Sequence, residues 1–289
     1  MTISVLAQAL VSGLLNGIMY GLLALGFTMM YGVLNIVNFA HGSQIMFAMF
    51  CTYILFTYYQ IDPYVSLFII VPVSMLLGIA LYKMLFSKIV GKSHSTQIVV
   101  TLSLLIFFEN AFNFLLGGNL RGIQTAYASS SIILGNISLP LARVYAALIA
   151  LLVIVVFTVL LHRTDFGAAV RAAYENRLGA LLVGVNVNRV YLISVAIVFL
   201  ATAVYGVVSM PYSLVSPSSG GSLLEMAFVI TVVGGLGSFN GALVAGLIVG
   251  VVEVLSGVIL KPEFTKAIVF GMLMLVILFK PNGILSKSG

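Results

Sequence analysis

Residues 5–33 have the sequence VLAQALVSGLLNGIMYGLLALGFTMMYGV, an apolar run without a charged side chain. About 20 apolar residues suffice for a helix to cross a bilayer, so this run predicts a long membrane-spanning helix. Four small residues recur at every fourth position: Ala9, Gly13, Gly17 and Gly21. This spacing places them on one helix face, where they let another helix approach closely. We expect that face to pack within this chain, and a seam between two copies is the alternative.

Composition extends this interpretation to the whole chain of 289 residues, of which 62% are hydrophobic and 7% are charged. Soluble proteins carry about 25% charged residues, and the mean hydropathy here is +1.22. The sequence therefore predicts an all-α, polytopic transmembrane bundle that forms a single domain over 1–289. The net charge of +6 is scattered over short loops, which argues against a nucleic-acid partner. The single Cys51 offers neither a disulfide nor a metal cluster.

Nine spans are expected, with eight or ten as alternatives if a glycine-rich segment enters the membrane without crossing it. Their ranges are 5–33, 43–59, 64–86, 98–116, 145–161, 190–210, a short span from 222, 242–260 and 265–279.

Basic residues divide unequally between alternate loops. Nine lie on one side: Lys83, Lys88, Lys92, Arg163, Arg171, Arg177, Arg189, Lys280 and Lys287. Four lie on the other: Arg121, Arg143, Lys261 and Lys266. The positive-inside rule then places the N-terminus outside and the C-terminus in the cytoplasm.

The polar segment 117–143 is expected outside the cytoplasm. Within it, two short β-prone runs, 132–134 and 137–139, flank Gly135 and Asn136. A Gly-Asn pair between such runs is typical of a hairpin turn. The sequence therefore predicts a small hairpin cap on the outer side of the membrane.

The longest polar interruption, 162–189, has the sequence HRTDFGAAVRAAYENRLGALLVGVNVNR and lies on the predicted cytoplasmic side. A short helix is expected over 166–174, with the charge of Asp165 at its positive N-terminal end. Asn176 is expected to cap a second helix over 177–183, which Gly184 ends. An apolar centre with a charged rim, as at protein interfaces, is expected from three residues spaced four apart: Phe166, Val170 and Tyr174.

Polar residues within or beside the apolar runs are candidates for a transport pathway, because ionisable groups in a membrane are costly and often functional. The candidates are Asn35, Asn38, His41, Glu109, Asn113 and Glu253. The segment 35–42, NIVNFAHG, is either a cytoplasmic turn or a re-entrant piece of a pathway. As the alternative, local hydrogen bonds would explain the two acidic residues without a role in transport: Glu109 with Asn110 or Asn113, and Glu253 with Ser256.

Two segments near the C-terminal end contain strong helix-breaking residues. Prolines, serines and glycines over 211–221 rule out a continuous helix. Ser222 and Glu225 then match a capping box, which predicts a helix start at Ser222. The glycine-dense segment 232–241 separates this short span from the next. The glycine faces near 13–26 and 234–250 are only loosely alike, so no internal repeat is predicted.

Catalytic motifs are missing from the sequence. It contains no HExxH pair, no GxSxG elbow and no GxxxxGK[ST] phosphate loop. We therefore expect a protein that is not an enzyme, has no metal site and binds no ATP of its own.

Several segments resemble the branched-chain amino acid ABC importer permeases of the LivH type. The opening is similar over Asn16–Gly26, Tyr31–Val33 and Asn38–Gly42. Later segments resemble that family's coupling loop (Thr164–Gly167, Arg171-Ala172, Gly184-Val185), its glycine segment (Gly234–Ser238) and its tail (Pro281–Leu285). The resemblance covers almost the full chain in the same order. Ser43 and the segment 48–50 depart from the usual pattern, so urea, short amides and aromatic acids stay open as substrates beside branched-chain amino acids.

This resemblance implies a membrane-spanning subunit of an ATP-driven importer in a bacterial inner membrane. Its implied partners are a second, LivM-like permease, two cytoplasmic LivF/LivG-like ATPases that bind ATP and Mg, and a periplasmic solute-binding protein. It implies that the ATPases couple through Thr164, Asp165, Phe166, Gly167, Arg171, Tyr174, Glu175 and Asn176. The residues alone leave two alternatives: a self-sufficient carrier that uses Glu109 and Glu253, and a membrane interaction protein without transport.

Overall fold

A computed structural model describes residues 3–135 and 137–285, so Asn136 of the predicted turn and Lys287 of the basic count lie outside the described residues. The fold is an all-α bundle with one two-stranded sheet, as predicted. The α-helices are α1 (Ile3–Leu34), α2 (His41–Tyr59), α3 (Pro63–Leu81), α4 (Ser87–Ile89), α5 (His94–Leu116), α6 (Leu141–Arg163), α7 (Asp165–Glu175), α8 (Arg177–Leu182), α9 (Val187–Ser209), α10 (Ser219–Gly234), α11 (Phe239–Ile259) and α12 (Thr265–Phe279). The shorter elements are η1 (Tyr82–Phe86), η2 (Met210–Tyr212), η3 (Pro262–Phe264), β1 (Ser131–Leu134) and β2 (Ile137–Pro140).

Seven helical segments within the described ranges are long and apolar enough to cross a membrane. They contain α1, α3, α5, α6, α9, α11 and α12. The protein is therefore a multi-pass membrane protein. The two other predicted spans are α2, whose first turn is polar, and α10, which has only 16 residues. Both begin inside the bundle, which is why they are less apolar or shorter than a full crossing.

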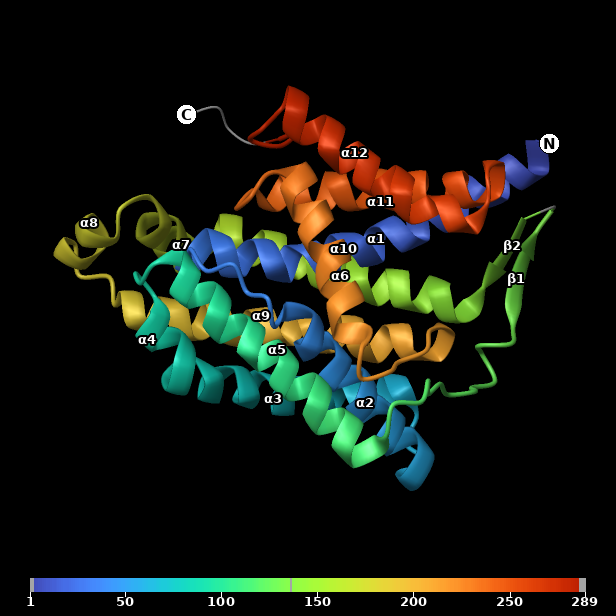
Figure 1. Cartoon of the computed structure of the whole chain (residues 1–289), viewed down its shortest axis with the longest axis horizontal. Helices are drawn as coiled ribbons and strands as arrows, with labels where there is room; N and C mark the ends of the chain where they lie inside the picture. The colour runs from blue at the N-terminus through green and yellow to red at the C-terminus, as the bar shows by residue number, and fades with distance from the viewer. Residues whose placement is uncertain (1–2, 136, 286–289) are drawn as a thin grey trace.

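The elements are sorted to opposite ends of the bundle. Figure 1 shows the hairpin β1–β2 and the start of α1 at one end, and α7, α8 and the last turn of α12 at the other. The strands pair antiparallel in the predicted position, with Leu134 opposite Ile137. This arrangement agrees with the predicted topology, in which the cap and the N-terminus share one side of the membrane and the long polar loop and the C-terminus share the other.

The segment 35–40 returns into the bundle after α1 ends. Asn35 adopts a left-handed conformation, with φ of 54°. His41 then starts α2 beside the middle of α1, because its Nε2 atom lies 3.1 Å from the carbonyl oxygen of Leu23, about three turns before the end of α1. Of the two alternatives for this segment, the structure selects the re-entrant one, and Figure 1 shows the chain passing from the end of α1 back toward the centre.

A second re-entrant segment, 213–218, precedes α10. It is held by a bridge between Arg121 and Val215, whose backbone groups exchange two hydrogen bonds of 2.8 Å each. The first turns of α2 and α10 meet directly: a methyl group on Gly42 would lie 1.9 Å from the carbonyl oxygen of Gly220. Only glycine permits this contact, so the two short helices begin side by side in the interior.

The second half of the chain repeats the order of helices of the first half, with each helix running in the opposite direction. Figure 1 shows α1, α2, α3 and α5 running opposite to α9, α10, α11 and α12, respectively. The packing follows the same order, since α1 packs along α11 and α3 packs along α9. This is an inverted-topology repeat, an arrangement that many transporters use. No sequence repeat had been predicted, because the two halves share a path without sharing clear residue similarity.

The small-residue face of α1 packs against α11, as expected for a face used within one chain. A methyl group on Gly17 would lie 2.7 Å from the Cα of Leu247, and one on Gly250 would lie 2.4 Å from the nitrogen of Gly17. The backbones of the two helices are therefore in direct contact. Dispersion forces and close packing stabilise such a seam in a membrane, where the hydrophobic effect contributes little.

Candidate functional site

The two short helices predicted for the polar loop are present as α7 and α8, at the end of the bundle opposite the cap. The Thr164 hydroxyl accepts a hydrogen bond from the nitrogen of Gly167 at 3.2 Å and caps α7. The Asn176 side chain accepts from the nitrogen of Gly179 at 2.9 Å and caps α8, as predicted. Gly184 has a φ of 85° and lies just past the end of α8, also as predicted. Asp165 lies in the first turn of α7 and Glu175 at its end.

Gly167 and Arg171 join α7 to the end of α6. A methyl group on Gly167 would lie 2.1 Å from the carbonyl oxygen of Leu161, which leaves no room for a larger residue. The Arg171 guanidinium donates a hydrogen bond to that same carbonyl. Both residues therefore fix the angle between α6 and α7, and a force applied to α7 would pass directly into a membrane-spanning helix.

The apolar surface of this pair differs from the one expected. Val170 is buried and Phe166 half-buried, so of the three predicted residues only Tyr174 is exposed. The α7 stripe packs onto the bundle because α7 lies against α1, α6 and α9. An exposed apolar surface, which we call the α8 patch, is formed by Leu178, Leu181, Leu182 and Val183. Leu182 is 88% exposed, and charged residues such as Arg177 and Glu175 surround the patch.

Tyr174 connects α7 to the turn between α10 and α11. A methyl group on Gly237 would lie 3.5 Å from the Tyr174 hydroxyl. The tail after α12 lies along the same turn, because the nitrogen of Ile284 donates to the carbonyl of Val233 at 2.9 Å. Figure 1 shows these segments at one end of the bundle. The glycine segment and the tail, both singled out from the sequence, are therefore packed together next to α7.

The first two candidate pathway residues have local roles in the re-entrant segment. Asn35 ends α1 and lines a groove of about 700 Å³ with Lys92, Tyr174 and Arg177. Asn38 is buried, and its side-chain oxygen accepts from the nitrogen of Ala40 at 3.1 Å. Neither residue lies in the cavities described below.

His41 and Gln44 form a buried polar cluster in the first turn of α2. His41 is fully buried, and because the Leu23 carbonyl is an acceptor, Nε2 carries the ring proton. The ring stands edge-on to Phe27, with centroids 5.4 Å apart. The Nδ1 atom of His41 and both polar atoms of Gln44 are buried without a hydrogen-bond partner.

Glu109 and Asn113 lie on α5, near the start of α10. The Glu109 carboxylate accepts a hydrogen bond from the nitrogen of Gly221 at 3.2 Å, so it satisfies a free donor in the first turn of α10. Glu109 and Asn113 share a pocket with Pro217 and Ser218. We conclude that Glu109 stabilises a helix start and does not share a cavity with Glu253.

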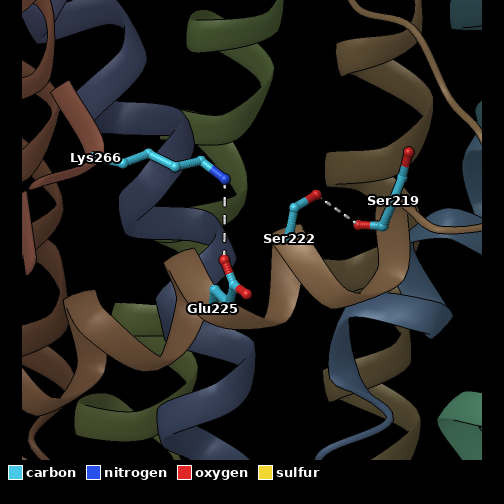
Figure 2. A network of polar contacts seen from close by, with 4 residues as sticks. All are labelled: Ser219, Ser222, Glu225 and Lys266. Carbon is cyan, nitrogen blue, oxygen red and sulfur yellow. Dashed lines mark hydrogen bonds and ion pairs between the residues drawn. The ribbon is translucent and has the colours of Figure 1, made fainter. Parts of the chain in front are cut away.

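The predicted capping box at Ser222 and Glu225 is wrong. The helix α10 begins at Ser219, and its first turn receives a carboxylate from α5 in place of its own side chain. Ser222 instead donates to the carbonyl of Ser219 at 3.0 Å. Figure 2 shows Ser222 and Glu225 projecting from the same side of α10, with Glu225 pointing to Lys266. These ions are 4.0 Å apart, and their side chains are 57% and 72% exposed.

Glu253 lines a cavity of about 170 Å³ bounded by α1, α9, α10, α11 and α12, which we call the Glu253 cavity. The side chains of Tyr20 and Tyr205 also line this cavity, and both hydroxyl groups lie within electrostatic reach of the Glu253 carboxylate. The Oε2 atom of Glu253 is buried without a hydrogen-bond partner. The rest of the lining includes apolar side chains: Leu23, Leu223, Met226, Val229, Val269 and Phe270.

A second cavity, of about 310 Å³, adjoins the first and is lined by Arg143, Tyr212 and serines of α9, α10 and the segment between them; we call it the Arg143 cavity. Tyr20, Tyr205, Ser222 and Leu223 border both cavities. The Arg143 guanidinium lies over the Tyr212 ring, 5.7 Å from its centroid. The two cavities together bring an acid, a base and several hydroxyls beside an apolar wall.

Of the six predicted pathway residues, only Glu253 lies in this pair of cavities. The sequence interpretation missed Arg143, Tyr20, Tyr205 and Tyr212. Arg143 had been counted only as a topology signal, and the tyrosines resemble any other membrane aromatics in sequence. Tyr20 of α1 and Tyr205 of α9 belong to corresponding helices of the repeated path, but this relation appears only in the fold and gives no signal in the sequence. No group of three His, Cys, Asp or Glu side chains that could hold a metal ion occurs within 3–135 and 137–285.

A polytopic bundle with an inverted repeat, interior helix starts and a polar cavity defines a membrane transport protein of the permease class. Residues 9–278 match the family model described as "Branched-chain amino acid transport system / permease component", and the chain belongs to this family. It is therefore a transport subunit. The earlier interpretation of the LivH-type segments is confirmed at this level.

Curated relatives support the assignment over nearly the full chain. The permease protein BraD of a high-affinity branched-chain amino acid transport system from Pseudomonas aeruginosa is 27% identical, over 97% of this chain and 95% of its own. The corresponding LivH of Salmonella typhimurium is also 27% identical, with the same coverage. A probable LivH of Methanocaldococcus jannaschii is 26% identical over 93% of this chain and 87% of its own. No solved structure matches.

Proposed function

We propose that this protein is the membrane-spanning subunit of an ATP-driven importer and passes branched-chain or chemically related amino acids across the membrane. A periplasmic solute-binding protein delivers the substrate to the cap side. Two cytoplasmic ATPases bind ATP and Mg at the opposite end, and a second, homologous permease completes the pathway. The names of the similar proteins support the substrate class, and the family supports the role of permease component.

The observation that carries this proposal is the α8 patch. Leu178, Leu182 and Val183 are each more than 70% exposed at the end of the bundle that carries most of the basic residues. Apolar side chains inside the membrane can face lipid, but a contiguous patch on a loop outside it marks a protein contact. An apolar centre with charged residues beside it is typical of a protein interface, and the match to the permease component of a transport system supports an ATPase as the partner.

A continuous series of contacts leads from this patch to the cavities. The pair α7–α8 is fixed to α6 through Gly167 and Arg171, and Tyr174 lies against Gly237. Gly237 belongs to the turn that ends α10, and α10 carries Ser222 and Glu225 on its cavity side. Closure of the ATPases would therefore move α7, and α7 would move α10.

The charged pair Glu225–Lys266 supports the second permease. Both side chains are largely exposed, Glu225 on the short apolar helix α10 and Lys266 in the first turn of α12. Charged side chains on such apolar helices face protein or water, because contact with lipid is costly. A homologous permease packed against α10 and α12 would cover them and close the side of the Glu253 cavity.

The substitution Leu182→Glu tests the α8 patch. We expect it to abolish ATP-driven uptake and to remove the ATPases from the purified complex, because interface anchors contribute about 2 kcal/mol or more. The measurements are the amount of ATPase that co-purifies with the tagged permease and leucine uptake by proteoliposomes. For ATPase association, the matched control is Ile133→Glu on the cap hairpin at the opposite end of the bundle, where Ile133 is 74% exposed. Equal ATPase association for the Leu182→Glu variant and the wild type would contradict the docking assignment.

A further inference from the structure

Glu253 and Arg143 have the chemistry needed to bind both charged groups of one free amino acid. We propose that Glu253 holds the ammonium group and Arg143 the carboxylate of a zwitterionic amino acid that lies across the two adjoining cavities. The inference rests on the proposed function and assigns the substrate position within it. Neither residue has this role in the sequence interpretation, where Glu253 was only one of six pathway candidates.

The first argument is that the two charges are close without being paired. Arg143 is near enough to interact electrostatically with Glu253. Yet within the described ranges the ion pair at salt-bridge distance is Lys266–Glu225, and the Arg143 guanidinium instead faces the Tyr212 ring. An acid and a base held apart in one polar space can each bind the opposite charge of a zwitterion.

The second argument is the unsatisfied hydrogen-bonding capacity of Glu253. The Tyr20 hydroxyl lies near its carboxylate, while the Oε2 atom is buried without a hydrogen-bond partner. A buried acceptor left without a donor costs about 1–3 kcal/mol, and more when it is charged. A substrate ammonium group carries three N–H donors, and one of them would satisfy Oε2 while its charge offsets that of the carboxylate.

The third argument is the lining around each charge. Arg143 shares its cavity with Tyr212 and with four serines: Ser209, Ser213, Ser219 and Ser222. Ser209, Ser213 and Ser222 already donate their hydroxyl protons to backbone carbonyls, so the guanidinium of Arg143 is the main carboxylate-binding group here. Its planar fork of N–H donors matches the two oxygens of a carboxylate. On the Glu253 side, Leu23, Val229 and Phe270 provide an apolar wall for the substrate side chain. The arrangement therefore favours a neutral amino acid with an apolar side chain over a urea or an amide, which lack the two charges.

The test uses the whole reconstituted complex with its binding protein and radiolabelled leucine as the probe. We expect Glu253→Gln and Arg143→Gln each to lower uptake at least about tenfold, while ATP hydrolysis stimulated by the loaded binding protein stays within about twofold. A tenfold loss corresponds to about 1.4 kcal/mol of lost binding free energy, which we expect when one charge-assisted contact to the substrate is removed. Retained hydrolysis distinguishes a lost substrate contact from a damaged fold or lost ATPase docking.

Two exposed residues at the cap end provide matched controls. Glu263→Gln and Lys261→Gln each remove a charge of the same sign in η3 and directly before it, and neither residue lines either cavity. We expect both controls to keep wild-type uptake. Should Glu253→Gln fail to accumulate, Tyr20→Phe removes the neighbouring hydroxyl without a charge change, and we then expect a raised KM for uptake with an unchanged level of protein.

The double variant Glu253→Gln with Arg143→Gln decides whether both residues hold one molecule. Groups that act on the same bound substrate are non-additive, so we expect the double variant to be no slower than the slower single variant. Three outcomes would overturn the inference and leave the proposed function standing. The single variants could keep uptake within about twofold of wild type, the losses of uptake could multiply in the double variant, or the control variants could lose as much uptake as the test variants. Absence of ATP-driven uptake by the wild-type complex would instead overturn the proposed function, and the inference with it.

Discussion

The two helices that begin in the interior, α2 and α10, differ in what surrounds them. From His41 to Phe50, α2 is buried on nearly every side, and its polar residues His41 and Gln44 have no access to solvent. By contrast, α10 buries Ala227 and Ile230 but exposes Ser222 and Glu225 beside the two cavities. Equivalent positions in an inverted repeat thus have different surroundings.

The starts of these helices are also satisfied differently. Before α2 begins at His41, the side chain of Asn38 accepts a hydrogen bond from the nitrogen of Ala40, so this contact lies within the segment that leads into the helix. The start of α10 instead depends on Glu109 from α5, a residue distant in sequence. We infer that α2 is the fixed member of the pair, held from all sides, and that α10 is the member whose position other elements control. The proposed coupling to ATPases uses both: a rigid support and an element that can respond to a force applied at α7.

The largest effect is expected where the two helices touch. Gly42→Ala should destabilise the protein by more than about 3 kcal/mol, the upper end for overpacking, because the new methyl group would meet the Gly220 carbonyl at 1.9 Å. Thermal unfolding of the detergent-solubilised protein measures this. Gly271→Ala in α12 is the matched control, since nothing lies within 4 Å of its methyl position. An equal and small effect of both substitutions would show that α2 and α10 do not pack as described.

Cysteine labelling sharpens the contrast between the buried and the exposed helix. Replacing the single Cys51 by alanine gives a cysteine-free background. In it, Ser222→Cys should react with a membrane-impermeant thiol reagent in the purified permease subunit alone, because Ser222 is exposed and borders both cavities. Gln44→Cys should stay unmodified, because Gln44 is only 2% exposed. Modification of both at similar rates would contradict the assignment of α2 as the fully enclosed member.

Features that depend on local sequence were largely predictable. Apolar runs located the membrane spans, and the last one, 265–279, matches α12 at both ends. The capping role of Asn176 and the end of α8 at Gly184 follow from short-range hydrogen bonding and backbone preference, which the residues themselves determine. The packing face of α1 was also correct, because a small-residue stripe has few other uses in a membrane helix.

Features that depend on distant contacts were not predictable. The capping-box motif at Ser222 is a correct local pattern, but Glu109 supplies the contact and the helix starts at Ser219. The apolar spacing in α7 was correctly identified, yet Val170 packs inward and the exposed surface lies on α8. Arg143 and Glu253 are 110 positions apart, and only the folded chain brings them to one pair of cavities.

A smaller loss is expected from the buried polar contact of α2. His41→Phe keeps an aromatic ring beside Phe27 and removes the hydrogen bond from Nε2 to the Leu23 carbonyl. We expect destabilisation by about 0.5–1.5 kcal/mol, the net value of one hydrogen bond. Thermal unfolding and uptake should be measured together. If unfolding is unchanged while uptake is lost, His41 has a transport role that its burial does not indicate.

The smallest effect is expected at the start of α10. Glu109→Gln keeps an oxygen that accepts from the nitrogen of Gly221 and removes only the negative charge near the helix N-terminus. That charge contributes about 0.3–1 kcal/mol, so unfolding should shift slightly, and the exposed Glu175→Gln serves as the control. Glu109→Ala removes the acceptor as well, and its additional loss measures the hydrogen bond. If Glu109→Gln instead abolished uptake with the fold intact, the carboxylate would act in transport. The position of α10 would then depend on the negative charge of Glu109 as well as on its hydrogen bond to Gly221.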